Sequence, residues 1–324
     1  MDSVTHLAGS SRDAFLAAVD SALDDELRPA GTGERARLAT AAGHLALAGE
    51  AKRARPGLCF SLGSAIGVRD VGALVDAAVG IELIHTASLL HDDVVDGDVV
   101  RRGRPTINAS AGNAVAVLTG DFVLARALGR LRAWPALLAQ AIDVLEQMTV
   151  AALVEIEARG DAAFDEARWR AMAAGKTGVL FGLCGAAAGF AAADAGRGAR
   201  FFAAGVHLGV AFQIADDVED LPGGDDVKER NPSFPVVAAA ARSERVRGLL
   251  LEAWSSDRAP DAAQIDLLSR EVMKAGGLRT ALDAARLEVE HARRAFGPDG
   301  RHATIAAVLG WADALVERAA QEAA

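Results

Sequence analysis

Apolar side chains recur at three- and four-residue spacing along most of this chain. Between positions 79 and 94 the apolar positions of this repeat are Val79, Leu83, Ile84, Ala87, Leu90 and Val94. This spacing is the period of an α-helix that is buried on one side, and no segment alternates convincingly enough to predict a strand. We therefore predict an all-α protein with ten or more helices joined by short loops.

Short turn-forming sequences that contain Gly or Pro separate the expected helices. Examples are Arg55-Pro56-Gly57, Gly103-Arg104-Pro105 and Leu221-Pro222-Gly223-Gly224. None is long or low in complexity, and no linker divides the chain into halves of different composition, although 324 residues would allow two domains. We expect one domain, a helical bundle that covers residues 1–324.

Charge and composition argue against several partners. The net charge is −10, Tyr is absent and aromatic residues make up 5% of the chain, which disfavours binding to nucleic acid or to an anionic membrane. The longest uncharged apolar stretch, residues 179–193, is shorter than the ~20 residues of a membrane span, and we see no signal peptide. Two cysteines, Cys59 and Cys184, are too few for a disulfide framework and fit a reducing cytoplasm.

Three carboxylates stand at the end of one strongly apolar predicted helix. This helix begins near Val71 and ends in His91-Asp92-Asp93-Val94-Val95-Asp96. Asp92 and Asp96 are four residues apart and share a face, while Asp93 lies about 100° round the helix. Hard oxygen ligands at this spacing suit Mg²⁺ shared with a substrate phosphate. Taken alone, a solvated acidic helix end explains the cluster as well.

The same spacing of aspartates closes a second apolar helix. Phe212-Gln213-Ile214-Ala215-Asp216-Asp217-Val218-Glu219-Asp220 ends a segment that begins near Phe201. Two copies of one rare pattern are hard to explain as two accidental acidic surfaces. Two such helices that face each other across a cavity could clamp several metal ions between them.

Two basic runs accompany the acidic clusters. Lys52-Arg53-Ala54-Arg55 precedes Pro56, and Arg101-Arg102-Gly103-Arg104 follows the first cluster within five residues. Either run alone would be a solvated face. Beside metal-type clusters in an acidic protein they indicate a bound anion, because Arg binds phosphate through its planar fork and Lys through a point charge.

Two further polar positions stay ambiguous from spacing alone. His85 lies two turns before Asp92 on the same broad helix face, where a lone histidine is more often a satisfied core residue. Lys176-Thr177 opens the next apolar helix, and an ordinary helix start explains it. No defensible Ser/His/Asp set, HExxH, Walker loop or GxGxxG is present, so hydride transfer and P-loop hydrolysis are unsupported.

At these residues the sequence resembles the trans-isoprenyl diphosphate synthase family, the polyprenyl synthetases. KRxRP, ExxHxxSLxHDDxxDxxxxRRGxPT, GDF at residues 120–122, KT and FQxxDDxxD occur in family order from about Lys52 to Val237. The resemblance implies an all-α bundle around a central cavity, the isoprenoid synthase type I fold, and usually a homodimer. It implies an enzyme that joins isopentenyl diphosphate head to tail to an allylic diphosphate.

The resemblance also implies roles for single residues. The implied ligands of Mg²⁺ on the allylic diphosphate are Asp92, Asp93, Asp96, Asp216, Asp217 and Asp220. The implied contacts to that diphosphate are Arg101 and Lys176. The implied contacts to isopentenyl diphosphate are Lys52, Arg55, His85 and Arg102. Thr177 and Gln213 are expected beside the substrate, near the developing carbocation.

Small residues set the expectation for product length. In the family geometry, the position one helical turn before the first cluster lines the cavity beneath the diphosphate, and a bulky aromatic residue there stops chain growth. This sequence has Ala87 and Ser88 as the wall, so we predict products of C20 or longer. Candidates for a deeper plug are Phe122, Met148, Leu153 and Phe181.

The sequence departs from the family pattern at several places. The loop after Asp220 is short (residues 221–230), and Asn231 takes the place of a family lysine, for which Lys228 is a substitute candidate. Residues 151–155 replace the usual Gly-Glu-x-x-Gln pattern. Two alternatives therefore stay open: a terpene cyclase or irregular prenyl-coupling enzyme on the same fold, and a non-catalytic subunit of a heteromeric synthase. The second should have lost the acidic motifs, which are complete here.

Overall fold

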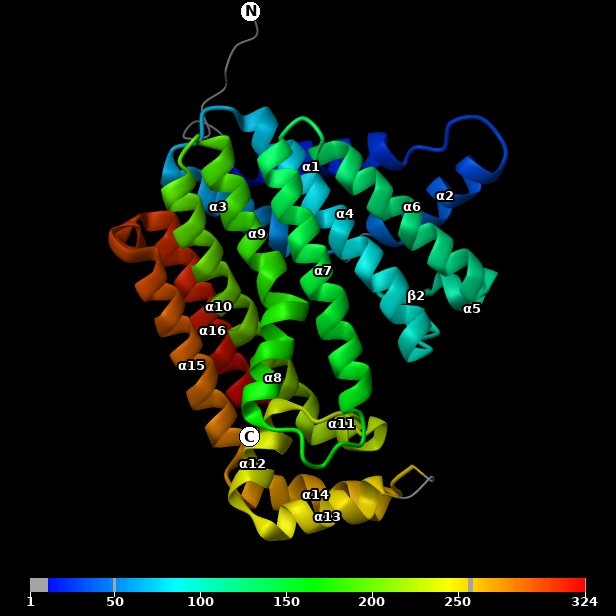
Figure 1. Cartoon of the computed structure of the whole chain (residues 1–324), viewed down its shortest axis with the longest axis vertical. Coiled ribbons are helices and arrows are strands. Elements are labelled where there is room, and N and C mark those ends of the chain that lie inside the picture. Colours follow the sequence, from blue (N-terminus) through cyan, green and yellow to red (C-terminus); the bar gives the residue numbers. More distant parts are fainter. Residues whose placement is uncertain (1–10, 49–50, 256–258, 324) are drawn as a thin grey trace, which may run out of the picture. The chain divides into compact units, whose positions relative to one another are not determined.

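The computed structural model describes residues 11–48, 51–255 and 259–323, and these are almost entirely helical (Figure 1). The α-helices are α1 (Arg12–Leu27), α2 (Glu34–Ala46), α3 (Ala54–Ile66), α4 (Val71–Asp96), α5 (Ile107–Ala111), α6 (Asn113–Leu131), α7 (Pro135–Ala158), α8 (Glu166–Ala173), α9 (Val179–Ala191), α10 (Ala195–Asp220), α11 (Asp225–Glu229), α12 (Phe234–Arg242), α13 (Glu244–Trp254), α14 (Ala262–Lys274), α15 (Gly277–Phe296) and α16 (Ala303–Glu322). Three other helical turns are η2 (Ala174–Gly178), η3 (Leu221–Gly223) and η4 (Gly297–Arg301). The all-α prediction is confirmed.

One small hairpin escaped the sequence analysis. Strands β1 (Val100–Arg101) and β2 (Arg104–Pro105) pair antiparallel, with Val100 opposite Pro105. The two residues of its turn, Arg102 and Gly103, have φ of 51° and 68°. Such left-handed pairs form the tightest hairpin turns, and a two-residue strand is too short for an alternating pattern to predict it. The hairpin follows directly on the first acidic cluster.

The chain divides into two compact units. Unit 1 comprises Met1–Asp143 and Leu183–Phe201, and unit 2 comprises Val144–Gly182 and Phe202–Ala324. The boundaries fall inside α7, α9 and α10. The single domain over residues 1–324 stays a prediction.

Unit 1 is built round α4. This helix packs against α1, α3 and α6, and it buries residues on several sides along most of its length. A helix that is apolar all round is expected in the middle of a bundle rather than at its surface. Figure 1 shows α6 running beside α4, and the two helices pack against each other. The first acidic cluster therefore stands at the end of a helix that is held from several directions.

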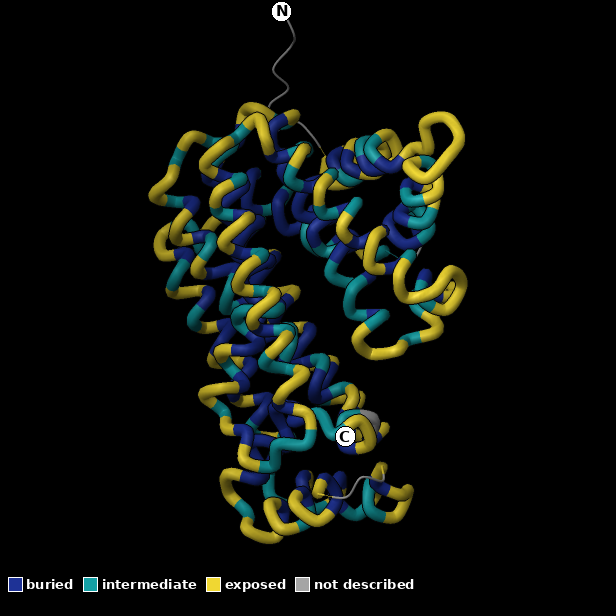
Figure 2. The backbone as a smooth tube through the Cα atoms, turned by 45° about the vertical axis from the view of Figure 1, so that its right-hand side comes forward, coloured by how far each residue is buried: buried dark blue, intermediate teal, exposed yellow. Residues whose placement is uncertain are grey.

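Unit 2 has its own apolar core. α12 is buried along nearly its whole length and packs against α8, α13, α14 and α15. The rings of Trp169 and Phe234 meet edge to face with centroids 4.7 Å apart, and both side chains are fully buried. Figure 2 shows buried and exposed residues alternating along the helices, as amphipathic helices require. The second acidic cluster ends α10 in this unit.

Four segments are long and apolar enough to cross a membrane by length and composition alone. They are Val71–Asp96, Pro135–Ala158, Glu166–Ala191 and Ala195–Gly223. The length of uncharged stretches alone does not reveal these helices, because they combine a few charges with high mean hydropathy. In three of the four, 61–78% of the apolar window is buried inside the protein, as in a bundle core. In α7 only 22% is buried, so this helix carries an uncovered apolar face.

Candidate active site

The first acidic cluster is fixed by a capped helix end. Gly97, with φ of 71°, ends α4, and its N–H donates to the carbonyl of Asp93. Asn108 Nδ2 donates to the carbonyls of Asp93 and Asp98 at 2.9 and 2.8 Å, and Thr106 Oγ1 donates to Asp98 at 2.7 Å. The negative end of the helix dipole adds to the repulsion among the carboxylates, so this end favours a cation. The sequence analysis assigned no role to Thr106 or Asn108.

The three aspartates of this cluster differ in exposure. Asp93 is buried at 1% exposure, Asp92 is half-buried and Asp96 is exposed. Arg101 forms an ion pair with Asp93 and a second one, at 2.7 Å, with Asp98. Burial raises the pKa of Asp93, and the hydrogen bond and charge of Arg101 offset only part of that rise. The buried carboxylate can therefore still gain from a further cation.

Guanidinium groups gather round His85. Burial and the positive charges of Arg55, Arg102 and Arg101 lower the pKa of His85 well below its usual value. The imidazole is therefore neutral at neutral pH and can donate one hydrogen bond. Arg102 lies in the hairpin turn and donates to the carbonyl of Leu45 at 3.3 Å. This set of residues favours an anionic ligand.

Within the first basic run, the residues have different environments. Arg53 is buried and forms ion pairs with Asp20 at 2.7 Å and with Glu82 at 2.9 Å. The positive charge of Arg53 is thus neutralised by these two acids inside the protein. Arg55 is half-buried and Lys52 is exposed. The predicted substrate contacts at Lys52 and Arg55 are compatible with these positions, and Arg53 has a structural role.

The GDF motif positions a histidine of the first cluster. His91 Nε2 lies 3.5 Å from Asp121 Oδ1, and Asp121 is on α6. A Cβ on Gly120 would stand 2.2 Å from His91 Nε2, so any larger residue would displace the imidazole. The glycine of this motif therefore allows α6 to approach α4 next to Asp92.

The predicted wall residues lie on α4. Ala87 is buried at 3% exposure, and half-buried Ser88 donates from Oγ to the carbonyl of His85 at 2.9 Å. Among the plug candidates, Phe181 is buried with its ring 5.7 Å from that of Phe212, whereas Leu153 is 55% exposed.

A chain of hydrogen bonds organises the second acidic cluster. Thr177 Oγ1 donates to Gln213 Oε1 at 2.9 Å, and Gln213 Nε2 donates to Asp217 Oδ1 at 3.1 Å. The backbone N–H of Phe234 donates to the other oxygen of Asp217 at 2.7 Å. Asp217 is buried, while Asp216 is half-buried and Asp220 exposed, the same gradient as in the first cluster. The predicted residues 177, 213 and 217 thus form one connected network.

A fourth acid, which the sequence analysis missed, belongs to this cluster. Burial and the charge of Asp226 raise the pKa of Asp217 well above its usual value. Burial likewise raises the pKa of Asp226 to about 6, although the hydrogen bond from Asn231 opposes the rise. The signal in the sequence is the short loop, which returns Asp226 to the end of α10.

Asn231 is an anchor for this loop. Its Nδ2 donates to Asp226 Oδ1 at 3.0 Å, and its backbone N–H donates to the carbonyl of Asp226 at 2.7 Å. The departure from the family lysine therefore has a structural reason: a neutral donor holds an acid that the short loop brings in. Lys228, the substitute candidate, is exposed on α11.

Lys176 and Thr177 do not stand at a helix start, which corrects the simplest interpretation of their position. They lie in η2, a single π-helical turn inside continuous helix from Glu166 to Ala191. Such turns are rare and frequent at functional sites. Lys176 forms an ion pair with Glu155 of α7, the residue that ends the altered middle-helix pattern.

The backbone of α10 packs closely against the π-helical turn η2. A Cβ on Gly209 of α10 would stand 2.6 Å from Gly178 Cα, so both positions need glycine. The contact brings Thr177 within hydrogen-bond distance of Gln213. The close contact between Gly178 and Gly209 thus positions the hydrogen-bond network of the second acidic cluster.

The predicted residues form two half-sites. The first half-site lies in unit 1 and contains the α4 aspartates, His85 and the surrounding arginines. The second half-site lies in unit 2 and contains Lys176, Thr177, Gln213 and the α10 aspartates. An all-α protein with two aspartate clusters of identical spacing at helix ends, one of them beside arginines, is of the isoprenoid synthase class.

Comparison with known proteins supports this class. The family model for polyprenyl synthetase matches residues 36–271. An octaprenyl diphosphate synthase from Haemophilus influenzae is 34% identical over 250 residues, which cover 72% of this chain and 69% of that protein. The chain belongs to the polyprenyl synthetase family and is a trans-polyprenyl diphosphate synthase family enzyme.

Solved structures agree with this assignment. A decaprenyl diphosphate synthase from Rhodobacter capsulatus has a TM-score of 0.86 at 28% identity, with 95% of this chain and 97% of that chain covered. A polyprenyl synthase from Caulobacter crescentus, complexed with calcium and isoprenyl diphosphate, has a TM-score of 0.83 at 28% identity, with 94% and 95% covered. The matched relatives make products from C20 to C50. Prenyltransferases of this family depend on a metal ion and use isopentenyl and allylic diphosphates.

Proposed function

We propose that the two half-sites form one Mg²⁺-dependent active site, which joins isopentenyl diphosphate head to tail to an allylic diphosphate. The observation that carries this proposal is a shared pattern. Each half-site has a buried aspartate at a helix end, preceded by a half-buried aspartate and followed three residues later by an exposed one. Hard carboxylate oxygens in this arrangement fit Mg²⁺, and the calcium and isoprenyl diphosphate of the Caulobacter relative support a divalent cation next to a diphosphate.

The proposed metal ligands are the six predicted aspartates, Asp92, Asp93, Asp96, Asp216, Asp217 and Asp220. Bound Mg²⁺ supplies Lewis-acid neutralisation of the leaving diphosphate. Arg101 and Lys176 add positive charge next to the same diphosphate. An ion pair with Asp93 holds Arg101 beside the first aspartate cluster, and an ion pair with Glu155 holds Lys176. Arg101 suits this role because its fork can bind a phosphate and a carboxylate together.

The arginines near His85 form the proposed site for isopentenyl diphosphate. Arg55 and Arg102 neutralise the diphosphate, exposed Lys52 adds a further charge, and neutral His85 donates a hydrogen bond. This diphosphate is not a leaving group, so it needs firm binding without polarisation of a C–O bond. The arrangement separates the two substrates by function: arginines hold one, and the metal and aspartates activate the other.

Bond changes follow from this arrangement. The allylic C–O bond breaks and its electron pair leaves with the diphosphate. The double bond of isopentenyl diphosphate attacks the allylic carbocation, a C–C bond forms, and the new cation loses a proton to the departed diphosphate. Thr177 and Gln213 turn oxygen lone pairs toward the positive charge, because their hydrogen bonds to each other and to Asp217 fix both side chains.

We further propose products of C20 or longer, since Ala87 and Ser88 leave the expected wall small. Replacing Ala87 with Phe should shorten the products, as measured by chromatography of the hydrolysed alcohols. Leu90→Phe, a buried change three residues (just under one turn) before Asp93 on the same helix, is the matched control for general disturbance of α4. An unchanged product length in Ala87→Phe would remove the wall assignment.

A homodimer is the proposed assembly. Val150, Leu153 and Ile156 on α7 are 58%, 55% and 40% exposed, and they form an apolar stripe at helical spacing. A second copy of the chain would cover this stripe. Sedimentation should show a dimer that Leu153→Glu weakens, and a wild-type monomer at assay concentration contradicts it. We also propose a cytoplasmic location, because the two buried cysteines, Cys59 and Cys184, remain thiols.

The direct test is a product analysis of the purified chain. Dimethylallyl, geranyl and farnesyl diphosphates are each incubated with isopentenyl diphosphate and Mg²⁺, and a chelator control removes the metal. We expect linear products longer than the primer and no reaction with chelator. A cyclised hydrocarbon, or a product without isopentenyl units, would favour the cyclase or irregular-coupling alternative. An inactive chain that gains activity with a second subunit would favour the heteromeric alternative.

A further inference from the structure

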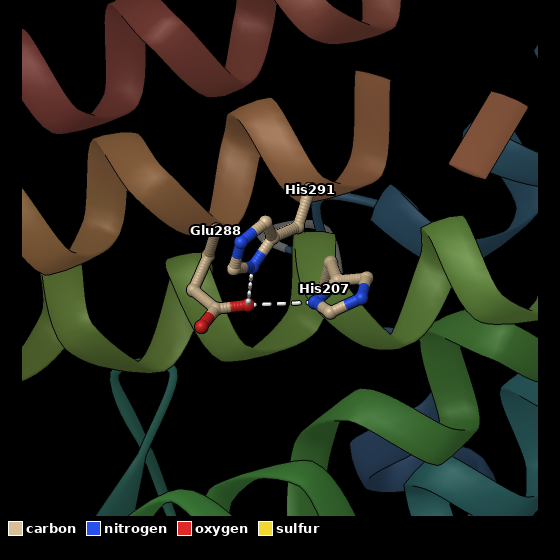
Figure 3. A group of neighbouring side chains, drawn as sticks. All are labelled: His207, Glu288 and His291. Carbon is tan, nitrogen blue, oxygen red and sulfur yellow. Dashed lines mark hydrogen bonds and ion pairs between the residues drawn. The ribbon is translucent and has the colours of Figure 1, made fainter. Parts of the chain in front are cut away.

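A second group of potential metal ligands lies in unit 2 and is separate from the aspartate clusters. His207 on α10 and Glu288 and His291 on α15 offer ligand atoms that all lie within 4.8 Å of one another. In the part of the chain that the structure describes, no other group of three or more His, Cys, Asp or Glu side chains has ligand atoms this close together. Figure 3 shows one carboxylate oxygen of Glu288 directed between the two imidazole rings.

The distances suit a small metal ion. His207 Nδ1 and His291 Nδ1 lie 2.7 and 3.7 Å from Glu288 Oε2. Ligand bonds of about 2.0–2.1 Å in a tetrahedral Zn²⁺ site place neighbouring ligand atoms about 3.3 Å apart. The two observed separations lie on either side of that value. Glu288 and His291 are three residues apart on α15 and share a face, so small side-chain movements are enough to form the site.

The carboxylate is already oriented for a single metal bond. Glu288 is buried, and Arg170 Nη1 holds its other oxygen, Oε1, at 2.5 Å. Arg170 in turn pairs with Glu166 at 2.9 Å, so its charge is shared between two carboxylates. Burial raises the pKa of Glu288, but the hydrogen bond from His207 and the nearby positive charges outweigh burial and lower it, so the carboxylate is ionised. A partner that fixes a ligand in this way is the usual support of metal sites.

The two imidazoles leave one side of the group open. The side chains of His207 and His291 are 37% and 34% exposed, whereas that of Glu288 is 9% exposed. Three protein ligands with a fourth position open to water is a common zinc arrangement. Imidazole nitrogen is a poor ligand for Mg²⁺ and a good one for Zn²⁺, Co²⁺ and Ni²⁺.

We infer that His207, Glu288 and His291 form a transition-metal site of the zinc type, distinct from the proposed Mg²⁺ site. Binding replaces the hydrogen bond between His207 and Glu288 with bonds from Nδ1 and Oε2 to the metal, and the imidazole proton resides on Nε2. The metal joins α10 to α15. Since His207 precedes Asp216 by nine residues on one helix, the site braces the helix that carries the second half-site.

The test uses the full chain with Co²⁺ as a spectroscopic probe in the presence of excess Mg²⁺, which occupies oxygen-only sites. We expect one equivalent of Co²⁺ with the intense visible absorption of four-coordinate nitrogen ligation. His207→Ala and His291→Ala should each weaken binding by at least about 100-fold. His302→Ala is the matched control, because this exposed histidine caps α16 and should leave the spectrum unchanged.

Zinc should also raise the thermal midpoint of the wild type by about 5 °C at saturating concentration, and this rise should vanish in the two histidine variants. Absence of the Co²⁺ spectrum in the wild type, or its retention in both variants, overturns the inference. If a variant fails to fold, X-ray absorption of the zinc-loaded wild type decides: two imidazole shells support the site, and oxygen-only ligation overturns it. The Mg²⁺-dependent product assay is a separate measurement, so this inference and the proposed function can fail independently.

Discussion

The two half-sites compensate their buried aspartates in different ways. Asp93 in the first half-site is matched by the guanidinium of Arg101, a full positive charge. Asp217 in the second is matched by neutral donors, the Phe234 N–H and Gln213, and it has a second acid, half-buried Asp226, as a neighbour. Asp217 is therefore less well compensated than Asp93, and metal binding and pH should affect the second half-site more strongly than the first.

Removal of either buried carboxylate should give the largest effect. We expect Asp93→Asn and Asp217→Asn each to lower kcat about 1000-fold, because each removes a carboxylate that we propose as a metal ligand. Unfolding by urea should separate them. Asp93→Asn takes a partner from Arg101 and should lower the free energy of unfolding strongly. Asp217→Asn removes a poorly compensated buried charge but turns an amide NH2 toward one of the two donors, Gln213 Nε2 or the Phe234 N–H, so it should lower the free energy of unfolding much less. Equal losses of stability would break the comparison.

The two predicted diphosphate cations offer a second contrast. Arg101→Ala and Lys176→Ala should each lower kcat about 100-fold. Arg101→Ala should also destabilise the protein by about 3 kcal/mol, because it leaves buried Asp93 without its cation. Lys176→Ala should cost under about 1 kcal/mol, since Glu155 is 19% exposed and keeps contact with water. Equal losses of stability in urea titrations would contradict the assigned difference.

The raised pKa of Asp226 predicts a specific pH dependence. The folded protein holds this proton up to a pKa of about 6, against an ordinary value of 3.8. Between these values the native state binds more protons than the unfolded state, so the free energy of unfolding falls as pH rises and the loss is complete above the upper value. Asp226→Asn should remove this loss and stabilise the protein at neutral pH by about 2 kcal/mol.

Below about pH 3 the same substitution should give little or no gain, because the carboxyl is then protonated in both states. The measurement is urea unfolding across pH without Mg²⁺. Glu252→Gln, at an exposed position on α13 and not among the charges that raise the pKa of Asp226, is the control and should leave the pH profile in place. A stabilisation by Asp226→Asn that is constant with pH would argue against the raised pKa.

The loop anchor gives the smallest expected effect. Asn231→Ala removes a side-chain hydrogen bond to Asp226 and should cost about 1 kcal/mol of stability. Lys228→Ala, at an exposed position on α11, should cost nothing measurable in stability. If Lys228 nevertheless substitutes for the family lysine, its removal will lower kcat more than Asn231→Ala does, and steady-state assays will show it.

Sequence patterns were sufficient for the all-α class and for the helix ends at which the two aspartate clusters stand. Helical period and residue order along the chain determine both, and α4 and α10 end at Asp96 and Asp220 as the spacing required. The patterns did not predict the contacts that tertiary structure creates. Asp226 entered the second cluster only through a short loop, and Lys176 lay in a π-helical turn rather than at a helix start.

The group formed by His207, Glu288 and His291 was not predicted for the same reason, because tertiary structure creates its contacts. Its members lie on α10 and α15, 81 residues apart at the hydrogen-bonded pair, and a lone histidine on a helix carries no signal of a partner so distant. Glu288 and His291 at three-residue spacing were the one local hint. The packing of α10 against α15 brings these residues together, and a local sequence pattern does not predict that packing.

The most direct test of the central claim is a crystal structure with Mg²⁺ and a non-hydrolysable allylic thiodiphosphate. We predict that oxygens of Asp92 and Asp216 bind Mg²⁺ ions at about 2.0–2.1 Å and that those ions contact one shared diphosphate. Arg101 and Lys176 should lie on the same diphosphate. Metal ions on only one aspartate cluster, or a diphosphate bound away from both, would contradict the account of a single active site made from two half-sites.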